Sequence, residues 1–178
     1  MGQYYKPINI NKKQWLYSHE FNSGLKLMEH SWIKNQLVQA VESLLTVEGD
    51  WYKNQIVWAG DYADEEPNSA ENLYSMTVND DGEDRMQKIK PSLIKNIEKL
   101  YPFIVNHSKK EFVDKRLVPI KEGWKIHPLP LLTCEGNGRG GGDFHGESNL
   151  IGKWARDSIS VEEEAPKGYE MIDFNLTE

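Results

Sequence analysis

The sequence predicts one α+β domain over residues 1–178, with a mostly antiparallel sheet and two main helices. Most apolar segments are short and rich in aromatic and β-branched residues, which is typical of strands. Two longer segments carry apolar residues at helical spacing. The connections are short and contain glycine, proline, asparagine or aspartate, so neighbouring strands are expected to pair in hairpins. A chain of 178 residues is long enough to bury one hydrophobic core.

The first segments, residues 4–10 and 14–21, are expected to be strands because both are rich in aromatic and β-branched residues. A turn is predicted at Asn22–Gly24. Residues 25–30 alternate, with Leu25 and Leu27 on one face, and are predicted to form a further strand.

The first main helix is predicted over Trp32–Thr46, with Ser31 as its N-cap and Gly49 beyond its end. Its apolar residues recur at a helical period and are expected to face the core. The residues predicted to be buried in this helix and in the next strand are Leu37, Val41, Leu44, Ile56 and Val57.

Residues 55–62 (QIVWAGDY) are predicted to form a buried strand that runs into an acidic loop. After a turn at residues 78–84, the second main helix is expected within residues 85–103. Its apolar face would consist of Ile89, Leu93, Ile94, Ile97 and Leu100.

The remaining segments are expected to be strands. Residues 103–117 have the pattern of a hairpin with its tip near Ser108–Lys110. Residues 129–134 (LPLLTC) form a short apolar run before a glycine-rich stretch, and residues 153–164 and 169–174 follow it.

Charge and cysteine content restrict the class of protein. The formal net charge of −7 and a pI near 5.3 argue against non-specific nucleic-acid binding, which needs a basic surface. Cys134 is the only cysteine, so no internal disulfide can form. No apolar signal segment or membrane span is recognised, and a cytoplasmic protein is expected.

Several strings in the sequence are distinctive. MGQYYK, GLKLMEHSW, VWAGDYAD and GNGRGGGDFHG together resemble an uncharacterised family of small bacterial and bacteriophage proteins. The resemblance extends over most of the chain. No established activity is attached to that family, so the resemblance implies a microbial or viral cytosolic origin and no particular chemistry.

The glycine-rich stretch is the first candidate site. The letters Gly-x-Gly-x-x-Gly occur at Gly136–Gly141, but residues 142–152 lack helical periodicity, so a dinucleotide-binding fold is not indicated. Successive glycine N–H groups can instead surround an anion, and Arg139 can add a forked pair of donors. The alternative is a tight loop that crosses another backbone, such as the Trp58–Tyr62 turn.

Acidic residues and a histidine form the second candidate. Asp143 and His145 follow the glycines, and Asp61 closes the predicted strand at residues 55–62. These three side chains could form a divalent-metal site or an acid–base pair, although no sequence spacing connects Asp61 to the other two. The residues predicted to bind a ligand are Asn137, Arg139, Gly140, Gly141, Asp143, His145, Trp58, Asp61 and Tyr62.

The predicted function is therefore a binding module that holds a small anionic ligand, such as a nucleotide, or a partner protein through the glycine-rich loop. One alternative is a metal-assisted hydrolase that uses Asp61, Asp143 and His145. Another is a phage protein that inhibits a host defence factor by direct contact. The binding-module interpretation includes no catalytic residue. The sequence indicates no particular cofactor and no oligomeric state.

Overall fold

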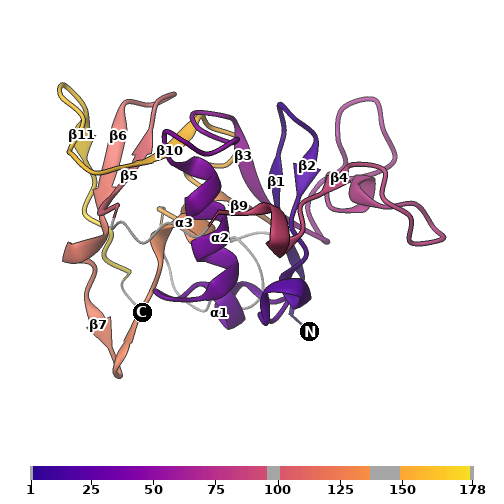
Figure 1. Ribbon diagram of the computed structural model, residues 1–178, viewed down its shortest axis with the longest axis horizontal. Helices are drawn as coiled ribbons and strands as arrows, with labels where there is room; N and C mark the ends of the chain where they lie inside the picture. Colours follow the sequence, from indigo (N-terminus) through magenta and orange to yellow (C-terminus); the bar gives the residue numbers. More distant parts are fainter. Residues whose placement is uncertain (1, 96–100, 137–148, 177–178) are drawn as a thin grey trace.

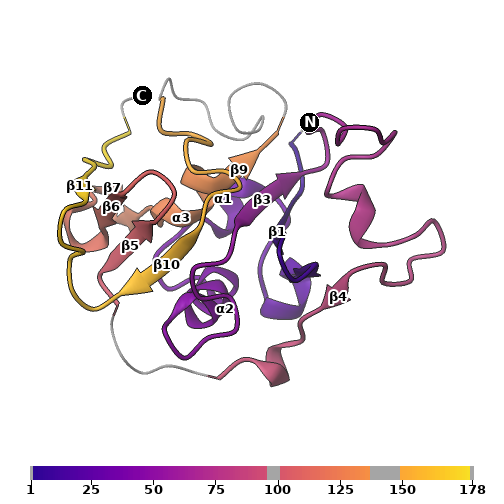
Figure 2. The same ribbon diagram turned by 90° about the horizontal axis from the view of Figure 1, so that it is seen from above.

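Two sheets on either side of a central helix make up the structure (Figure 1). The computed structural model describes residues 2–95, 101–136 and 149–176. The helix α2 stands between the two sheets in Figure 1 and is seen end-on in Figure 2. Both sheets and α2 contribute side chains to one buried cluster, which includes Trp58, Val41 and Val161. The expected α+β class is confirmed.

The larger sheet has five strands in the order β4-β2-β1-β3-β9. Its central strand β1 pairs antiparallel with β2 and with β3. The two outer strands, β4 and β9, pair in parallel with β2 and β3. The bounds are β1 Tyr5–Asn9, β2 Gln14–Trp15, β3 Ile56–Gly60, β4 Gln87–Lys88 and β9 Cys134–Glu135.

The second sheet has four strands in the order β10-β5-β6-β11, and a separate two-stranded ribbon joins β7 to β8. The expected hairpin at residues 103–117 is confirmed as the antiparallel pair β5–β6. Strand β11 pairs in parallel with β6. The bounds are β5 Phe103–Asn106, β6 Glu111–Asp114, β7 Ile120–Lys121, β8 Trp124–Lys125, β10 Ile159–Glu162 and β11 Glu170–Met171.

The prediction of a mostly antiparallel arrangement is wrong, because both larger sheets are mixed. The three parallel pairs all involve the two-residue strands β4, β9 and β11. Each of these strands reaches the sheet edge from a distant part of the chain. Hairpin patterns in a sequence indicate antiparallel neighbours and carry no signal for such late edge strands.

The helix α2 spans Gln36–Leu45, shorter than the predicted Trp32–Thr46. Asn35 is its N-cap and accepts a hydrogen bond from the Val38 N–H at 3.2 Å. Ser31 instead lies at the end of the short helix α1, where its hydroxyl donates to the Leu27 carbonyl. The predicted burial of Leu37, Val41, Leu44, Ile56 and Val57 is confirmed.

Two predicted strands are helices in the structure. Residues 25–30 contribute one isolated bridge at Lys26 and then the helix α1, Leu27–His30. Residues 129–134 lie mostly in the helix α3, Pro128–Thr133, which His127 caps through its side chain. All six residues of α3 are buried. A helix that is apolar all round has the same sequence pattern as a buried strand.

The second main helix, expected within residues 85–103, is absent from the residues described there. Gln87–Lys88 form β4, and Pro91–Leu93 form one of the four 3-10 helices in the described residues. The backbone N–H of Ile89 donates to the Trp15 carbonyl at 2.8 Å, so pairing with the sheet replaces helical hydrogen bonds. Ile97 and Leu100 lie outside the described residues. The other 3-10 helices are Ser18–Phe21, Ser75–Thr77 and Lys115–Leu117.

Candidate functional site

The candidate site lies at the edge of the larger sheet where β3 and β9 end. These two strands are parallel, with Trp58 opposite Cys134 and Ala59 opposite Glu135. Asp61 directly follows β3, and Gly136, the first residue of the glycine-rich stretch, directly follows β9. The carboxyl ends of adjacent parallel strands are a common position for ligand sites. The pairing of β3 with β9 therefore brings Asp61 to the same sheet edge as the start of the glycine-rich stretch. Sequence spacing alone did not indicate this proximity.

Two glycines allow β9 to approach this edge closely. A Cβ atom at Gly60 would lie 2.6 Å from the Glu135 carbonyl oxygen. A Cβ atom at Gly152 would lie 2.8 Å from the Cys134 carbonyl oxygen, and Gly152 also has φ +74°. Side chains at these positions would push β9 away, so both glycines are needed for close backbone contact.

A cavity of about 460 Å³ opens at this edge. One wall is the loop after β3, and the other is β9 with the segment that follows Leu150. The lining residues are Ala63, Asp64, Glu65, Glu66, Pro67, Cys134, Glu135, Gly136, Ile151, Gly152 and Arg156.

Arg156 lies between two carboxylates in this cavity. Its Nη1 donates to Glu66 Oε2 at 3.0 Å, and its Nη2 donates to Glu135 Oε2 at 2.9 Å. The second oxygen of each carboxylate also accepts from the same guanidinium. The hydrogen bonds from Arg156 hold the pKa of Glu66 below its usual value, and those to Glu66 and Glu135 raise the pKa of Arg156. Glu66 and Arg156 are therefore both charged at neutral pH.

The backbone also fixes Arg156 in position. Its φ of +67° is in the left-handed region, which is uncommon for a residue with a side chain. Its N–H donates to the Ile56 carbonyl at 2.8 Å, which ties it to the start of β3. The side chain is 37% exposed, compared with 16% for Glu66 and 27% for Glu135.

The described lining of the cavity is rich in hydrogen-bond acceptors. Asp64, Glu65, Glu66 and Glu135 contribute carboxylates, whereas Arg156 is the single cation among the described lining residues. Its guanidinium is already engaged by two of them. Carboxylate oxygens can each accept more than one hydrogen bond, so acceptor capacity remains after the Arg156 contacts. This lining suits a ligand that donates hydrogen bonds or carries positive charge.

Three of the predicted ligand-binding residues lie in the described part of the chain. Asp61 Oδ1 accepts from the Tyr4 N–H at 3.0 Å, which holds this carboxylate against the amino end of β1. Tyr62 is 49% exposed and stands beside the cavity-lining residue Ala63. Trp58 is completely buried, and its indole N–H donates to His30 Nε2 at 2.8 Å.

His30 is the hydrogen-bond partner that explains the position of Trp58. Its Nδ1 lies 2.9 Å from the Gly24 carbonyl oxygen, so Nδ1 carries the proton and Nε2 accepts from Trp58. Burial lowers the pKa of His30 to about 4. The neutral imidazole and the indole therefore form a core contact, and Trp58 offers no exposed ring to a ligand.

The other predicted binding residues, Asn137, Arg139, Gly140, Gly141, Asp143 and His145, lie outside the described residues. Cys134, just before them, is 2% exposed and donates through Sγ to the Leu131 carbonyl. Burial raises the pKa of this thiol to about 12, so it stays protonated at neutral pH. Cys134 therefore acts as a packing residue.

Sequence reasoning missed Glu66, Glu135 and Arg156. Glu135 and Arg156 lie in stretches that read only as strands, and Glu66 lies in an acidic loop. One signal in the sequence could have indicated this site. Glu66, Glu135 and Arg156 each lie within a few residues of the end of a predicted strand. The parallel pairing of β3 with β9, together with the hydrogen bond from the Arg156 N–H to the Ile56 carbonyl, brings them together.

Comparisons with known proteins give no further information. No family model matches the chain, and neither the curated proteins nor the solved structures contain a match. Within the described residues, no cluster of three or more histidine, cysteine or acidic side chains has the geometry of a metal site. No helix there has the length and apolar character to span a membrane.

Proposed function

We propose that the protein is a binding module for a small ligand at the β3–β9 edge, and that this ligand is a nucleotide. The observation that carries the proposal is the cavity in which Arg156 holds Glu66 and Glu135 at the start of the glycine-rich stretch. A nucleotide suits this site because it combines two chemistries. Its base donates hydrogen bonds, and its phosphate is anionic.

The base fits the carboxylates of the described lining. Guanine presents a ring N–H and an amino group side by side, and a carboxylate accepts both in a forked arrangement. Glu135 is the better acceptor for the base because its side chain is more exposed than that of Glu66. Arg156 orients Glu135 for this contact.

We assign the phosphate to the glycine-rich stretch, which begins at Gly136 and continues outside the described residues. Arg139 and the glycine N–H groups at Gly140 and Gly141 are the predicted phosphate donors. Asp64, Glu65, Glu66 and Glu135 would repel a phosphate inside the cavity, so this proposal puts the base in the cavity and the phosphate on the glycine-rich stretch. An anion without a base would lack the contact with Glu135 and is a poorer ligand. The hydrolase alternative, which uses Asp61, Asp143 and His145, stays a prediction.

The test is a thermal-shift and calorimetry panel with GTP, ATP, guanosine, inorganic phosphate and spermidine. A ligand of the folded protein raises the melting temperature by mass action. We expect GTP to bind more tightly than guanosine or phosphate. Glu135→Gln should lower the affinity for GTP by about tenfold, because the site loses a charged hydrogen-bond acceptor. The matched control is Glu164→Gln, an exposed glutamate outside the cavity lining.

Other outcomes separate the possible ligands. Binding of spermidine alone, lost in Glu135→Gln, would replace the nucleotide with a simple cation. If only phosphate binds and Glu135→Gln does not change its affinity, the glycine-rich stretch is an anion site and the cavity does not take part in binding. No response to any probe would overturn the proposal of a small-molecule site.

A further inference from the structure

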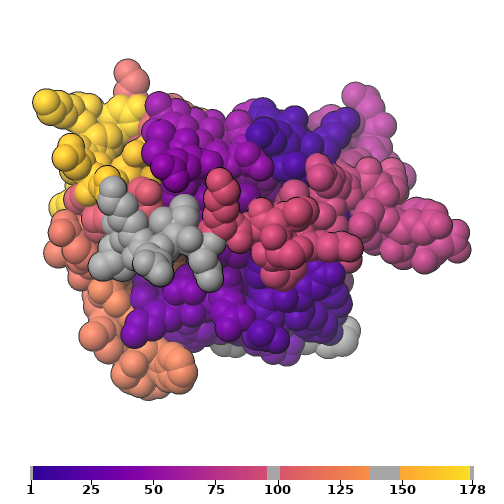
Figure 3. Space-filling model, in the orientation of Figure 1, coloured from indigo at the N-terminus to yellow at the C-terminus, as the bar shows by residue number. Residues whose placement is uncertain are grey.

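We infer that residues 64–71 form a flap over the β3–β9 cavity, and that the ion pair between Glu66 and Arg156 holds this flap closed. The inference concerns how a ligand enters and leaves the cavity, and it rests on the proposed function only for the identity of that ligand. The flap belongs to the part of the chain between β3 and β4, which extends at the right of Figures 1 and 3.

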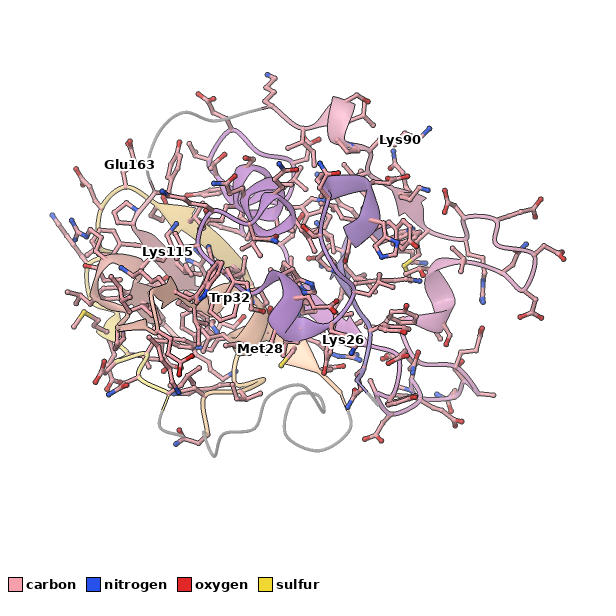
Figure 4. All side chains as sticks on the ribbon, turned by 90° about the horizontal axis from the view of Figure 1, so that it is seen from below. Lys26, Met28, Trp32, Lys90, Lys115 and Glu163 are labelled. Atoms are coloured by element: carbon pink, nitrogen blue, oxygen red, sulfur yellow. The ribbon has the colours of Figure 1, made fainter. Side chains whose placement is uncertain are left out.

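The flap makes little apolar contact with the body of the protein. None of residues 61–71 is buried. The apolar cluster that contains Val57 and Ala59 includes Leu73 and Tyr74 but no residue of the flap. Figure 4 shows many side chains of this part of the chain pointing outward at the right. Segments with few buried apolar contacts open at a low cost in free energy, so the flap is a movable wall of the cavity.

Backbone hydrogen bonds make most of the flap one compact unit. The Glu66 N–H donates to the Glu71 carbonyl at 2.8 Å, and the Ser69 N–H donates to the Glu66 carbonyl at 3.0 Å. The Glu71 N–H in turn donates to the Ser69 hydroxyl at 3.1 Å. Residues 66–71 therefore form a closed turn that can move without losing its own conformation.

The base of the flap is fixed by one side chain. Asn72 is buried, and its Nδ2 donates to the carbonyls of Asp61 and Ala63, both at 3.0 Å. The exposed residues Asp64 and Glu65 lie between this fixed base and the closed turn. A few loop residues beside a fixed base are the usual position of a hinge. We therefore place the hinge at residues 64–65.

Two ion pairs connect the closed turn to the rest of the chain. Both carboxylate oxygens of Glu66 accept from Arg156, with Nη1 to Oε2 at 3.0 Å. Both carboxylate oxygens of Glu71 accept from Arg85 Nη1, at 2.8 and 3.0 Å. Glu66 and Arg156 line opposite walls of the cavity, whereas Glu71 and Arg85 are not among its lining residues. Only the Glu66–Arg156 pair therefore has to break for the cavity to open.

Arg156 stays with the body of the protein when this pair breaks. Its N–H bonds the Ile56 carbonyl, and its guanidinium also donates to Glu135 on β9. The Glu66 side chain is 16% exposed, compared with 40% for Glu71. Solvent screens the Glu66–Arg156 pair less, so this pair is the stronger of the two attachments of the flap.

Charge favours an open flap once the pair is lost. Asp64, Glu65 and Glu66 place three carboxylates on the flap, and Glu135 lies on the opposite wall. Arg156 is the single cation in the described lining that offsets them. Like charges repel, so a flap without its contact to Arg156 is driven away from β9.

The first experiment measures the rates of ligand exchange by stopped-flow with a fluorescent GTP derivative. Because a closed flap blocks both entry and exit, Glu66→Gln should raise the association and dissociation rate constants together, each by about fivefold. The dissociation constant should change less than either rate constant. Glu71→Gln is the matched control, since it weakens the ion pair outside the cavity and should leave both rate constants unchanged.

The second experiment needs no ligand. Spin labels are attached to cysteines at Ala70, on the flap, and at Lys153, which follows the cavity-lining residue Gly152. Both positions are exposed, whereas the native Cys134 is 2% exposed and shielded from the reagent. Pulsed electron paramagnetic resonance then measures the distance between the labels. Glu66→Gln should shift the distances to longer and broader values, and Glu71→Gln should not.

Three results would overturn the inference. The first is an unchanged distance distribution in Glu66→Gln, and the second is an equal change in Glu71→Gln. The third is faster dissociation of GTP from Glu66→Gln without faster association, which would make Glu66 a ligand acceptor instead of the closing contact. If Glu66→Gln lengthens the distances but no form of the protein binds GTP, the flap stands and only the proposed nucleotide fails.

Discussion

Two clusters of charged side chains in this protein have opposite compositions. At the base of the β7–β8 ribbon, one carboxylate, Glu42, binds two nitrogen groups, His127 and Lys115. At the β3–β9 edge, one guanidinium, Arg156, binds two carboxylates, Glu66 and Glu135. The first cluster uses its acceptor to join three segments of the chain. The second retains unused acceptors and faces a cavity.

The difference between the clusters separates a structural role from a binding role. His127 is 2% exposed and Lys115 is 14% exposed, so loss of Glu42 would leave two shielded donors without an acceptor. Arg156 is 37% exposed, so solvent can replace part of what a lost carboxylate provides. Substitutions should therefore reduce stability at the first cluster and ligand binding at the second.

The largest expected effect is that of Glu42→Gln on stability. We expect the free energy of unfolding to fall by about 2–4 kcal/mol, because a partly buried ammonium and a buried imidazole lose their charged acceptor. Urea denaturation measures this change. Glu164→Gln, at an exposed position, should change it by less than about 0.5 kcal/mol. Equal values for the two variants would remove the distinction between the clusters.

The second-largest expected effect is a loss of stability at acid pH that comes from Glu42. Burial alone would raise the pKa of Glu42, but contact with His127 and Lys115 prevails and lowers it from 4.5 to about 2. The unfolded chain therefore binds more protons between these values, and stability falls as the pH falls through that window. The loss from this group is about 3 kcal/mol. This loss should be absent from Glu42→Gln, so urea denaturation of both proteins at about pH 5 and about pH 2 isolates it.

Sequence reasoning succeeded where the signal is local. The apolar period predicted the burial of Leu37, Val41 and Leu44, and the pattern of residues 103–117 predicted the β5–β6 hairpin. It failed where distant segments decide the outcome. Pairing with β2 determines the conformation of Gln87–Lys88, and burial on all sides determines that of Pro128–Thr133.

The candidate site shows the same division. The sequence indicated the end of β3 and the start of the glycine-rich stretch as functional positions. It could not indicate that Arg156 joins Glu66 to Glu135, because that contact links residues 90 and 21 positions apart. The position of Trp58 near the strand end predicts a ligand contact. In the structure its ring instead points into the core toward His30.

A smaller loss of stability is expected for Gly60→Ala. The added Cβ would lie 2.6 Å from the Glu135 carbonyl oxygen, and backbone there has little room to move. We expect a loss of about 1–3 kcal/mol in the free energy of unfolding. Because β9 must shift, the affinity for GTP should also decrease. Unchanged stability and affinity would indicate that β9 is not held closely at this edge.

The smallest effect on stability is expected for Arg156→Lys, although its effect on binding should be large. Lysine keeps the positive charge but cannot donate two parallel hydrogen bonds to each of Glu66 and Glu135. Because the arginine side chain is 37% exposed, we expect the free energy of unfolding to change by less than about 1 kcal/mol. The carboxylates would lose their fixed orientation, and the affinity for GTP should fall by about tenfold. Calorimetry and urea denaturation on the same preparations measure both quantities. A large loss of stability with unchanged affinity would place Arg156 with Glu42 among the structural residues, and the contrast between the two clusters would fail.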